Sequence, residues 1–211
     1  MFTLFIGSKN LSSWSLRPWL VLKMLDEPFE EQLIDLTAPG ASQKILAINP
    51  AGKVPLLHDR HLKIWDSLAI CEYLAECFPH AELWPVGNAE RAHARSVVAE
   101  MHSGFPLVRQ AMPMDICGQH PTPPLTTPLQ REIDRILTIW TELRQEHVAD
   151  GPFLFGHFTI ADAFFAPVVT RFNSYQYPLT GLAADYADHM LALPAMQQWA
   201  EAAKAETALA C

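Results

Sequence analysis

The spacing of hydrophobic residues divides the chain into two parts. Up to about residue 80, short apolar runs typical of buried strands alternate with stretches in which apolar residues recur at helical spacing. Asp59-Arg60-His61 separates two of these runs and predicts a hairpin. The predicted order is β-α-β-α-β-β-α, with elements at residues 3–7, 16–24, 29–36, 42–48, 54–58, 62–65 and 66–78.

Beyond residue 88 every strong signal is helical. Residues 88–112 form one long amphipathic stretch, and a proline-rich break follows at 113–128. Further helices are predicted at 129–148, 159–172, 182–191 and 195–208, of which 159–172 is nearly all apolar and therefore central and buried. We expect a thioredoxin-like α/β domain over residues 1–80, a linker over 81–88 and an all-α C-terminal domain over 89–211.

The charge balance argues against a nucleic-acid partner, and the hydropathy argues against a membrane span. The formal net charge is -8 and there is no run of lysine or arginine, whereas nucleic-acid binding needs a clustered basic surface. No stretch of about 18 apolar residues predicts a membrane span. The apolar start, Met1 to Gly7, is too short for a signal-peptide core and lacks a basic beginning. We therefore expect no nucleic-acid partner and no membrane association.

The cysteines offer neither a metal site nor a dithiol. None of them is paired as C-x-x-C, so the spacing fails for both. Free thiols are typical of a reducing compartment, and we expect a cytoplasmic protein without a metal. The four cysteines are Cys71, Cys77, Cys117 and Cys211.

Two serines lie in the turn that enters the first predicted helix. Ser12 and Ser13 open the sequence S-S-W-S-L-R-P at residues 12–18. A serine there can simply cap the helix by accepting a backbone N–H bond. Alternatively, its hydroxyl can donate a hydrogen bond to an anion, which the positive end of the helix also favours. A thiolate held at this point would have a lowered pKa and would be a better nucleophile.

Two further segments suit the two ends of a small peptide. Pro55 opens a strand, where a trans peptide is the more frequent form, but a cis peptide would turn the backbone of Val54 outward to pair with a peptide alongside. Asp66 and Ser67 begin a helix, so that Ser67 and the helix amides suit a carboxylate and Asp66 suits an ammonium. Plain helix capping by Asp66 is the alternative.

A fourth motif is structural. Thr159 and Asp162 form an acidic variant of the capping box at the start of the predicted central helix. No catalytic role follows from this pattern.

Taken together, these four motifs resemble the cytosolic glutathione transferase superfamily over essentially the full chain. The resemblance implies that Pro55 is cis, that Val54 pairs with the cysteinyl backbone of glutathione, and that Asp66 and Ser67 bind its γ-glutamyl end. It also implies that Thr159 opens the central helix of the C-terminal domain. Glutathione would be the co-substrate, with no metal, and the protein would be a homodimer.

Residues 12–17 look most like the zeta class, which includes maleylacetoacetate isomerases and carries S-S-C-S-x-R at this place. This chain has Trp14 at the cysteine position, and it has Ser174 where the class places an arginine, with Arg171 about one turn earlier. The chain is therefore identified as a serine-type bacterial transferase related to that class. The expected activity is detoxifying transfer of glutathione to a hydrophobic electrophile.

The resemblance also assigns expected roles to individual residues. Ser12, or after a one-residue shift Ser13, would donate to the glutathione sulfur, and Lys53 and Lys44 would meet the glycyl carboxylate. A glutathione-dependent cis-trans isomerase and a non-catalytic interaction protein with this fold remain as alternatives, whereas a thiol reductase would need a cysteine near Ser12. The second-substrate pocket is expected between the domains, at Leu11, Trp14, Met101, His102, Phe105, Arg109 and Arg171. For most of these residues, packing at the interface between the domains is the alternative.

Overall fold

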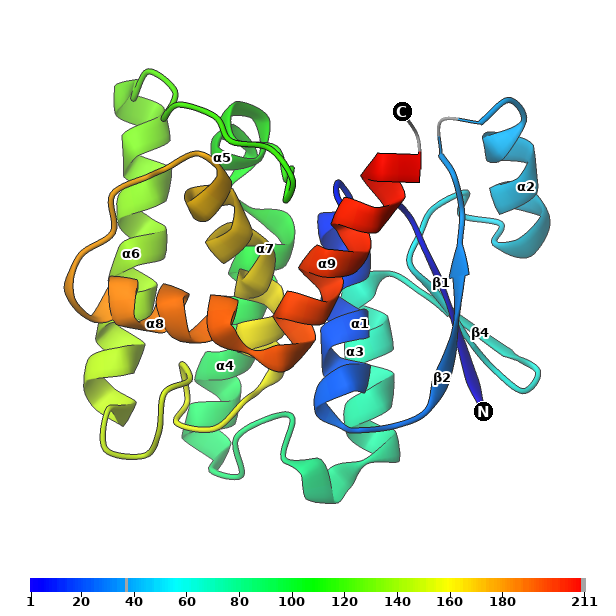
Figure 1. Cartoon of the computed structure of the whole chain (residues 1–211). Helices are drawn as coiled ribbons and strands as arrows, with labels where there is room; N and C mark the ends of the chain where they lie inside the picture. The colour runs from blue at the N-terminus through cyan, green and yellow to red at the C-terminus, as the bar shows by residue number, and fades with distance from the viewer. Residues whose placement is uncertain (37, 210–211) are drawn as a thin grey trace.

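The computed structural model describes residues 1–36 and 38–209, which form two lobes side by side (Figure 1). One lobe is a sheet with three helices and the other is helical throughout. The elements of the first lobe are β1 (Phe2–Ile6), α1 (Ser13–Met24), β2 (Phe29–Leu33), α2 (Ala41–Ile48), β3 (Leu56–Asp59), β4 (Leu62–Trp65) and α3 (Ser67–Cys77). This is the predicted order, with boundaries shifted by a few residues.

The sheet is mixed, with strand order β2-β1-β3-β4. β1 runs parallel to β2 and antiparallel to β3, and β3 and β4 form the predicted hairpin between Asp59 and Leu62. Figure 1 shows α1 and α3 between the sheet and the helical lobe, with α2 on the outer side. The thioredoxin-like α/β domain predicted from the order of elements is therefore confirmed.

The middle of helix α1 is buried on every side rather than on one face. All residues from Ser15 to Leu22 are buried, because the helix packs against α3 on one side and α7 (Ile160–Ser174) of the helical lobe on the other. Trp19 also meets Trp199 of α9 (Pro194–Leu209) edge to face, with ring centroids 4.9 Å apart. The core is thus continuous across the two lobes.

The helical lobe is built around α7. Every residue of this helix except Asn173 is buried, which confirms the predicted central helix. At its start the Asp162 carboxylate accepts the backbone N–H of Thr159 at 2.8 Å and that of Leu154 at 3.0 Å, so the predicted capping box is present. The elements are a 3₁₀ turn (Pro79–Ala81), α4 (Asn88–Ser103), α5 (Pro106–Ala111), α6 (Thr127–His147), α7 (Ile160–Ser174), α8 (Gly181–Ala192) and α9 (Pro194–Leu209).

The structure divides the long amphipathic stretch of residues 88–112 into two helices, because the chain breaks between α4 and α5. Pro106 has no N–H to donate and disfavours the helical conformation of the residue before it, so Phe105 adopts a left-handed φ of 59°. Gly104 caps α4, and a Cβ at this position would lie 2.6 Å from the carbonyl oxygen of Glu100. The break gives α5 a direction of its own.

The proline-rich segment before α6 is held by side chains of both lobes. Asn10 donates to Asp115 Oδ1 at 2.9 Å and accepts the backbone N–H of Cys117 at 2.8 Å. His120 lies 2.8 Å from the other oxygen of Asp115. These contacts tie the segment to the loop that precedes α1.

Three of the four cysteines lie in the described part of the chain. Cys71 is buried, Cys77 is exposed and Cys117 is intermediate, and all three are free thiols. Cys211 lies outside the described residues. Within residues 1–36 and 38–209, none of the helices combines the length and the hydropathy that crossing a membrane requires.

Candidate functional site

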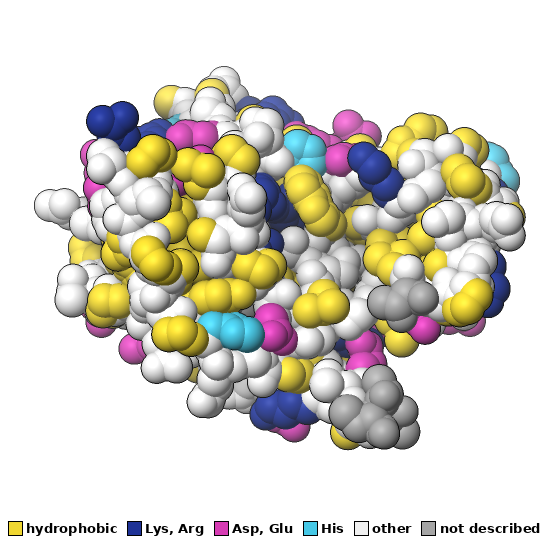
Figure 2. All heavy atoms as spheres, turned by 90° about the horizontal axis from the view of Figure 1, so that it is seen from above, with side chains coloured by type: hydrophobic (Ala, Val, Ile, Leu, Met, Phe, Trp, Pro, Cys, Tyr) yellow, Lys and Arg dark blue, Asp and Glu magenta, His cyan; other side chains and the backbone are white. Residues whose placement is uncertain are grey.

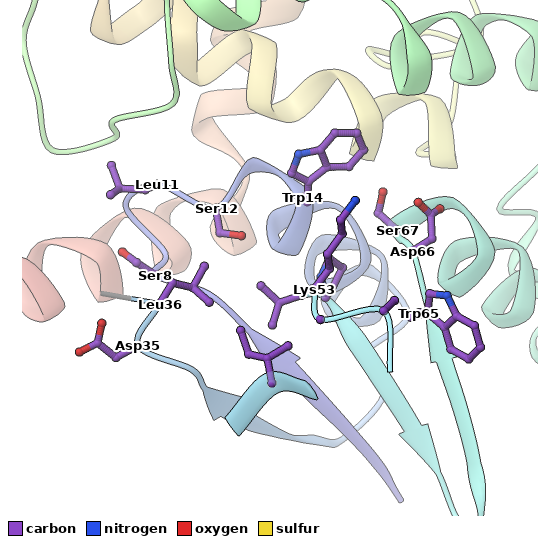
Figure 3. A pocket seen from close by; sticks show the side chains of 15 residues that line it. Ser8, Leu11, Ser12, Trp14, Asp35, Leu36, Lys53, Trp65, Asp66 and Ser67 are labelled. Atoms are coloured by element: carbon purple, nitrogen blue, oxygen red, sulfur yellow. The ribbon is translucent and has the colours of Figure 1, made fainter. Parts of the chain in front are cut away.

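A cavity of about 760 Å³ opens where α1, the loop before β3 and the start of α3 meet. Seen from above, hydrophobic side chains gather around the hollow between the two lobes (Figure 2). The cavity is lined by Ser8, Leu11, Ser12, Trp14, Asp35, Leu36, Ile45, Ala51, Gly52, Lys53, Val54, Pro55, Trp65, Asp66 and Ser67. It therefore brings together three of the four motifs that the sequence analysis singled out (Figure 3).

Of the two candidate serines, it is Ser12 that lines the cavity. Ser12 caps α1, and its oxygen accepts the backbone N–H of Ser15 at 3.3 Å. The hydroxyl groups of Ser12 and Ser15 are 2.7 Å apart, and Ser15 in turn accepts the backbone N–H of Gly7 at 3.1 Å. Ser13 is only 5% exposed and is not part of the lining. Capping and a role at the cavity therefore coexist in one residue.

The loop before β3 forms the opposite wall. The Val54–Pro55 peptide is cis, as the family resemblance implies. Buried Asn49 anchors this loop, because its amide donates to the carbonyl oxygen of Lys53 at 2.7 Å and its oxygen accepts the N–H of Ala51 at 3.0 Å. Lys53 lines the cavity and is exposed. Lys44 is exposed on α2 and stands outside the lining.

Asp66 and Ser67 form the third wall. Asp66 has a left-handed φ of 75° and caps α3, with Oδ1 accepting the N–H groups of Leu68 at 2.8 Å and Ala69 at 3.4 Å. Its other oxygen lies 3.3 Å from Nε2 of His102 in α4. Ser67 is 1% exposed, and its hydroxyl accepts a hydrogen bond from the guanidinium of Arg17 at 3.3 Å.

Arg17 is a buried cation directly behind these walls. Its guanidinium lies over the Trp14 ring at 4.2 Å and over the Phe164 ring at 4.5 Å. Nε and Nη2 are buried without a hydrogen-bond partner among the described residues. Burial, reinforced by the positive charge of Arg109, lowers the pKa of Arg17 to about 9. The region behind Trp14 is therefore strongly electropositive.

The residues expected to bind the second substrate divide into two groups. Leu11 and Trp14 line the cavity. The others stand outside its lining: the His102 ring lies 5.3 Å from the Trp14 ring, and the guanidinium of Arg109 lies over that ring at 5.0 Å. Met101 and Phe105 are buried, as is Arg171, which donates to the carbonyl oxygen of Met112 at 2.6 Å. Trp14 thus separates the cavity from His102 and Arg109.

Sequence reasoning gave no role to three residues that shape the site. Ser15 and Arg17 lie in the motif that drew attention to Ser12, but only the fold shows that Ser15 contacts Ser12 and that Arg17 is fully buried. Trp65 lies at the cavity with 49% of its surface exposed. An exposed tryptophan directly before Asp66, at the end of a strand, was the available signal.

No metal centre is evident in the described part of the chain. Among residues 1–36 and 38–209, no group of three or more histidine, cysteine, aspartate or glutamate side chains is placed to hold an ion. The polar side chains around the cavity are three hydroxyls, one lysine and two carboxylates, of which Asp66 lies at the start of α3. This set suits a zwitterionic peptide-like ligand.

A thioredoxin-like domain followed by a helical domain is the glutathione transferase architecture. Comparison with known proteins agrees. The family model described as "Glutathione S-transferase, N-terminal domain" matches residues 11–77, and the one described as "Glutathione S-transferase, C-terminal domain" matches residues 123–202. The chain belongs to the glutathione S-transferase family.

The individual relatives are named for different functions. A probable maleylacetoacetate isomerase of Caenorhabditis elegans is 39% identical over 97 residues, which are 46% of this chain and only 44% of that protein. A stringent starvation protein A homolog of Haemophilus ducreyi is 27% identical over 188 residues, covering 86% of this chain and 79% of that protein. A solved glutathione transferase homolog from Burkholderia GL BGR1 with bound glutathione has a TM-score of 0.71 at 25% identity, covering 96% of this chain and 97% of that one.

Proposed function

We propose that the protein binds glutathione in this cavity and joins it through its sulfur to a hydrophobic electrophile, with the Ser12 hydroxyl stabilising the thiolate. The observation that carries the proposal is that Ser12, Val54 and the Asp66-Ser67 pair line one cavity. The relative from Burkholderia GL BGR1, which was solved with glutathione, supports the choice of ligand.

The three walls suit three parts of glutathione. The cysteinyl backbone lies along Val54, the γ-glutamyl carboxylate meets the hydroxyl and the backbone N–H of Ser67, and the γ-glutamyl ammonium meets Asp66. Lys53 lines the cavity and is the residue that we propose for the glycyl carboxylate, whereas Lys44 stands outside the lining. This placement leaves the sulfur beside the N-terminus of α1.

The serine pair allows Ser12 to donate to the sulfur. In the structure Ser12 Oγ accepts the N–H of Ser15 and donates to Ser15 Oγ. Rotation of both hydroxyls reverses the second bond, so that Ser15 donates to Ser12. The Ser12 proton is then free to point at the thiolate, which the positive end of α1 also stabilises. The sulfur lone pair attacks the electrophilic carbon, a C–S bond forms, and the leaving group departs with its bonding electrons.

The test compares Ser12→Ala with the matched control Ser13→Ala. Loss of one hydrogen bond to a charged sulfur is expected to lower kcat roughly 10- to 100-fold, with the Kd of glutathione changed by less than about threefold. Ser13→Ala should stay near the wild-type rate, because Ser13 is buried away from the lining. The rate is measured by a chromogenic conjugation assay and the Kd by calorimetry. An equal loss of rate and affinity in Ser12→Ala would contradict the role.

A second candidate activity is glutathione-dependent cis-trans isomerisation. It is favoured by the relative named as a probable maleylacetoacetate isomerase and by the serines that open residues 12–17. The same thiolate would add to a cis double bond and be expelled after rotation about the resulting single bond. Direct assay with maleylacetone separates the two activities.

A third candidate is a non-catalytic protein of this fold. It is favoured by the relatives named as stringent starvation protein A homologs, which match 86% of this chain under a name other than that of a transferase. A Ser12 that lines the cavity beside the Asp66-Ser67 pair favours the enzyme, because a binding module has no need of a thiolate donor. Absence of glutathione binding at millimolar concentration would favour the non-catalytic protein.

We further propose that the protein is a cytoplasmic homodimer that pairs through the region of β4, α3 and α4. The support is the exposure of apolar side chains on β4, with Leu62 43% and Trp65 49% exposed. A shallow groove lined by Ile64, Trp65 and Leu68 continues the same surface.

A further inference from the structure

The two oxygens of the Asp66 carboxylate serve different partners. Oδ1 is committed to capping α3 through the N–H groups of Leu68 and Ala69. Oδ2 faces Nε2 of His102 at 3.3 Å, and His102 belongs to the last turn of α4 in the helical lobe. Any ammonium that approaches Asp66 must therefore share Oδ2 with this imidazole.

The surroundings of His102 come from four other elements. Its ring meets Trp14 of α1 at 5.3 Å and Phe164 of α7 at 5.9 Å. The charged groups that face it are the Asp66 carboxylate at the start of α3, the Arg17 guanidinium of α1 and the Arg109 guanidinium of α5. Nδ1 is buried and has no hydrogen-bond partner among the described residues.

These surroundings favour the neutral imidazole near pH 7. Burial lowers the pKa of His102, and the charges of Arg17 and Arg109 act in the same direction, against the opposing effect of Asp66. In the neutral ring, a proton on Nε2 allows donation to Asp66 Oδ2 and leaves the lone pair on Nδ1. Protonation of Nδ1 would make His102 a cation in direct contact with the same carboxylate.

We propose that His102 is a positioning residue for the γ-glutamyl ammonium of glutathione: neutral His102 orients Asp66 for that ammonium, and protonated His102 competes with it for Oδ2. The proposal rests on the glutathione site proposed above. Because His102 lies on α4, it also makes the helical lobe part of the γ-glutamyl subsite. Trp14 and Phe164 pack against both His102 and Arg17, so the partners of Asp66 and of Ser67 are held by one cluster.

The direction of the pH dependence follows from binding linkage. The ammonium of bound glutathione brings a positive charge to Asp66, which disfavours the protonated form of His102. Binding therefore releases a proton at acidic pH, and affinity falls as the pH drops through the pKa of free-state His102. The carboxyl groups of free glutathione titrate well below pH 5. The thiol would ionise in this window once Ser12 stabilises its thiolate, so glutathione and its analogue are used as their S-methyl derivatives in the calorimetry below.

The first experiment measures the Kd of glutathione by calorimetry from pH 5 to pH 7.5 for wild type, His102→Gln and His93→Gln. Wild type should lose about 5- to 20-fold in affinity toward pH 5, which is the range typical of coupled sites. His102→Gln keeps a donor amide that cannot titrate, so its affinity for glutathione should change little toward pH 5. We call the fall in affinity at acidic pH the acid limb. His93→Gln alters an exposed histidine of the same helix and should keep it.

A ligand variant gives an independent readout. An analogue of glutathione in which the γ-glutamyl amino group is replaced by hydrogen has no ammonium to compete with His102. Wild type should bind it more weakly than glutathione and with a flat pH profile over the same range. A steep acid limb for this analogue would overturn the proposal.

Proton NMR of the wild-type histidines keeps the test valid if His102→Gln folds poorly. The His102 resonance should titrate at lower pH when glutathione is saturating, whereas an unchanged titration would overturn the proposal. An acid limb of equal depth in wild type and His102→Gln would also overturn it, while leaving glutathione binding intact. Absence of glutathione binding by wild type at every pH would instead reject the proposed function, and this inference with it.

Discussion

Arg17 is a buried cation whose removal should make the protein more stable. Replacement by methionine keeps a side chain of similar length and removes the charge. Among the described residues, the guanidinium has only the Ser67 hydroxyl as a hydrogen-bond partner, and two of its nitrogens are buried without one. Burial of an unpaired charge is costly, so we expect Arg17→Met to raise the free energy of unfolding.

The size of the effect can be worked from the site. A pKa lowered to about 9 corresponds to roughly 5 kcal/mol of unfavourable interaction of the charged form, at about 1.36 kcal/mol per pKa unit. The stacking on Trp14 and Phe164 offsets about 1–2 kcal/mol for each ring, and the bond to Ser67 about 1 kcal/mol. The expected net gain is therefore between about 0 and 2 kcal/mol.

The matched control is Arg144→Met. Arg144 is also buried, but its guanidinium donates to the carbonyl oxygens of Phe153 and Gly151, the latter at 2.6 Å. Removal of these bonds leaves the Gly151 carbonyl without a donor among the described residues, whereas the Phe153 carbonyl keeps the N–H of Gly156 at 3.1 Å. We expect the free energy of unfolding to fall by about 2–4 kcal/mol. Urea unfolding followed by circular dichroism measures both variants. If Arg17→Met were destabilised as much as Arg144→Met, the reasoning about unpaired charge would be refuted.

The stabilised variant should bind glutathione more weakly than the wild type. Arg17 holds the Ser67 hydroxyl and supplies positive charge behind the cavity. We expect Arg17→Met to bind glutathione several-fold more weakly while unfolding at a higher urea concentration. Calorimetry on the same samples checks this opposite change in affinity and stability.

Two further predictions concern the serine pair and the quaternary structure. Ser15→Ala removes a hydrogen-bond partner of the Ser12 hydroxyl and of the Gly7 N–H. We therefore expect kcat to fall about 3- to 10-fold, which is less than for Ser12→Ala. A full wild-type rate would exclude Ser15 as a partner in catalysis. Light scattering at micromolar concentration should show that the wild-type protein is a dimer. Trp65→Glu places a charge on the proposed interface and should give a monomer. A wild-type monomer would contradict the proposed dimer.

Local patterns were sufficient to predict most of the fold. The hairpin at Asp59-Arg60-His61 and the capping box at Thr159 and Asp162 depend on residues that are near each other in sequence, so their signals are visible without a structure. The break at Gly104 was missed because the apolar spacing continues through it on both sides. Pro106 was the available signal, since a proline favours a helix boundary before it.

The site was predictable only as far as motifs reach. Ser12, Val54 and Asp66 stand out because each lies at the start of an element, where backbone groups are free to bind a ligand. The burial of Arg17 and the approach of His102 to Asp66 depend on how α1 and α4 pack against α7. Such contacts join residues far apart in sequence, and no local pattern of charge or hydropathy predicts them.

The burial of α1 from Ser15 to Leu22 bears on how proteins of this architecture can be taken apart or recombined. Trp19 rests on Trp199, and the residues from Ser15 to Leu22 are covered by both lobes at once. An excised fragment ending near residue 80 would present that apolar surface to water and would tend to aggregate. Chimeras that exchange the first half between relatives should therefore fold only when α7 and the facing part of α9 are exchanged with it, so that the two halves are inherited as one cooperative unit.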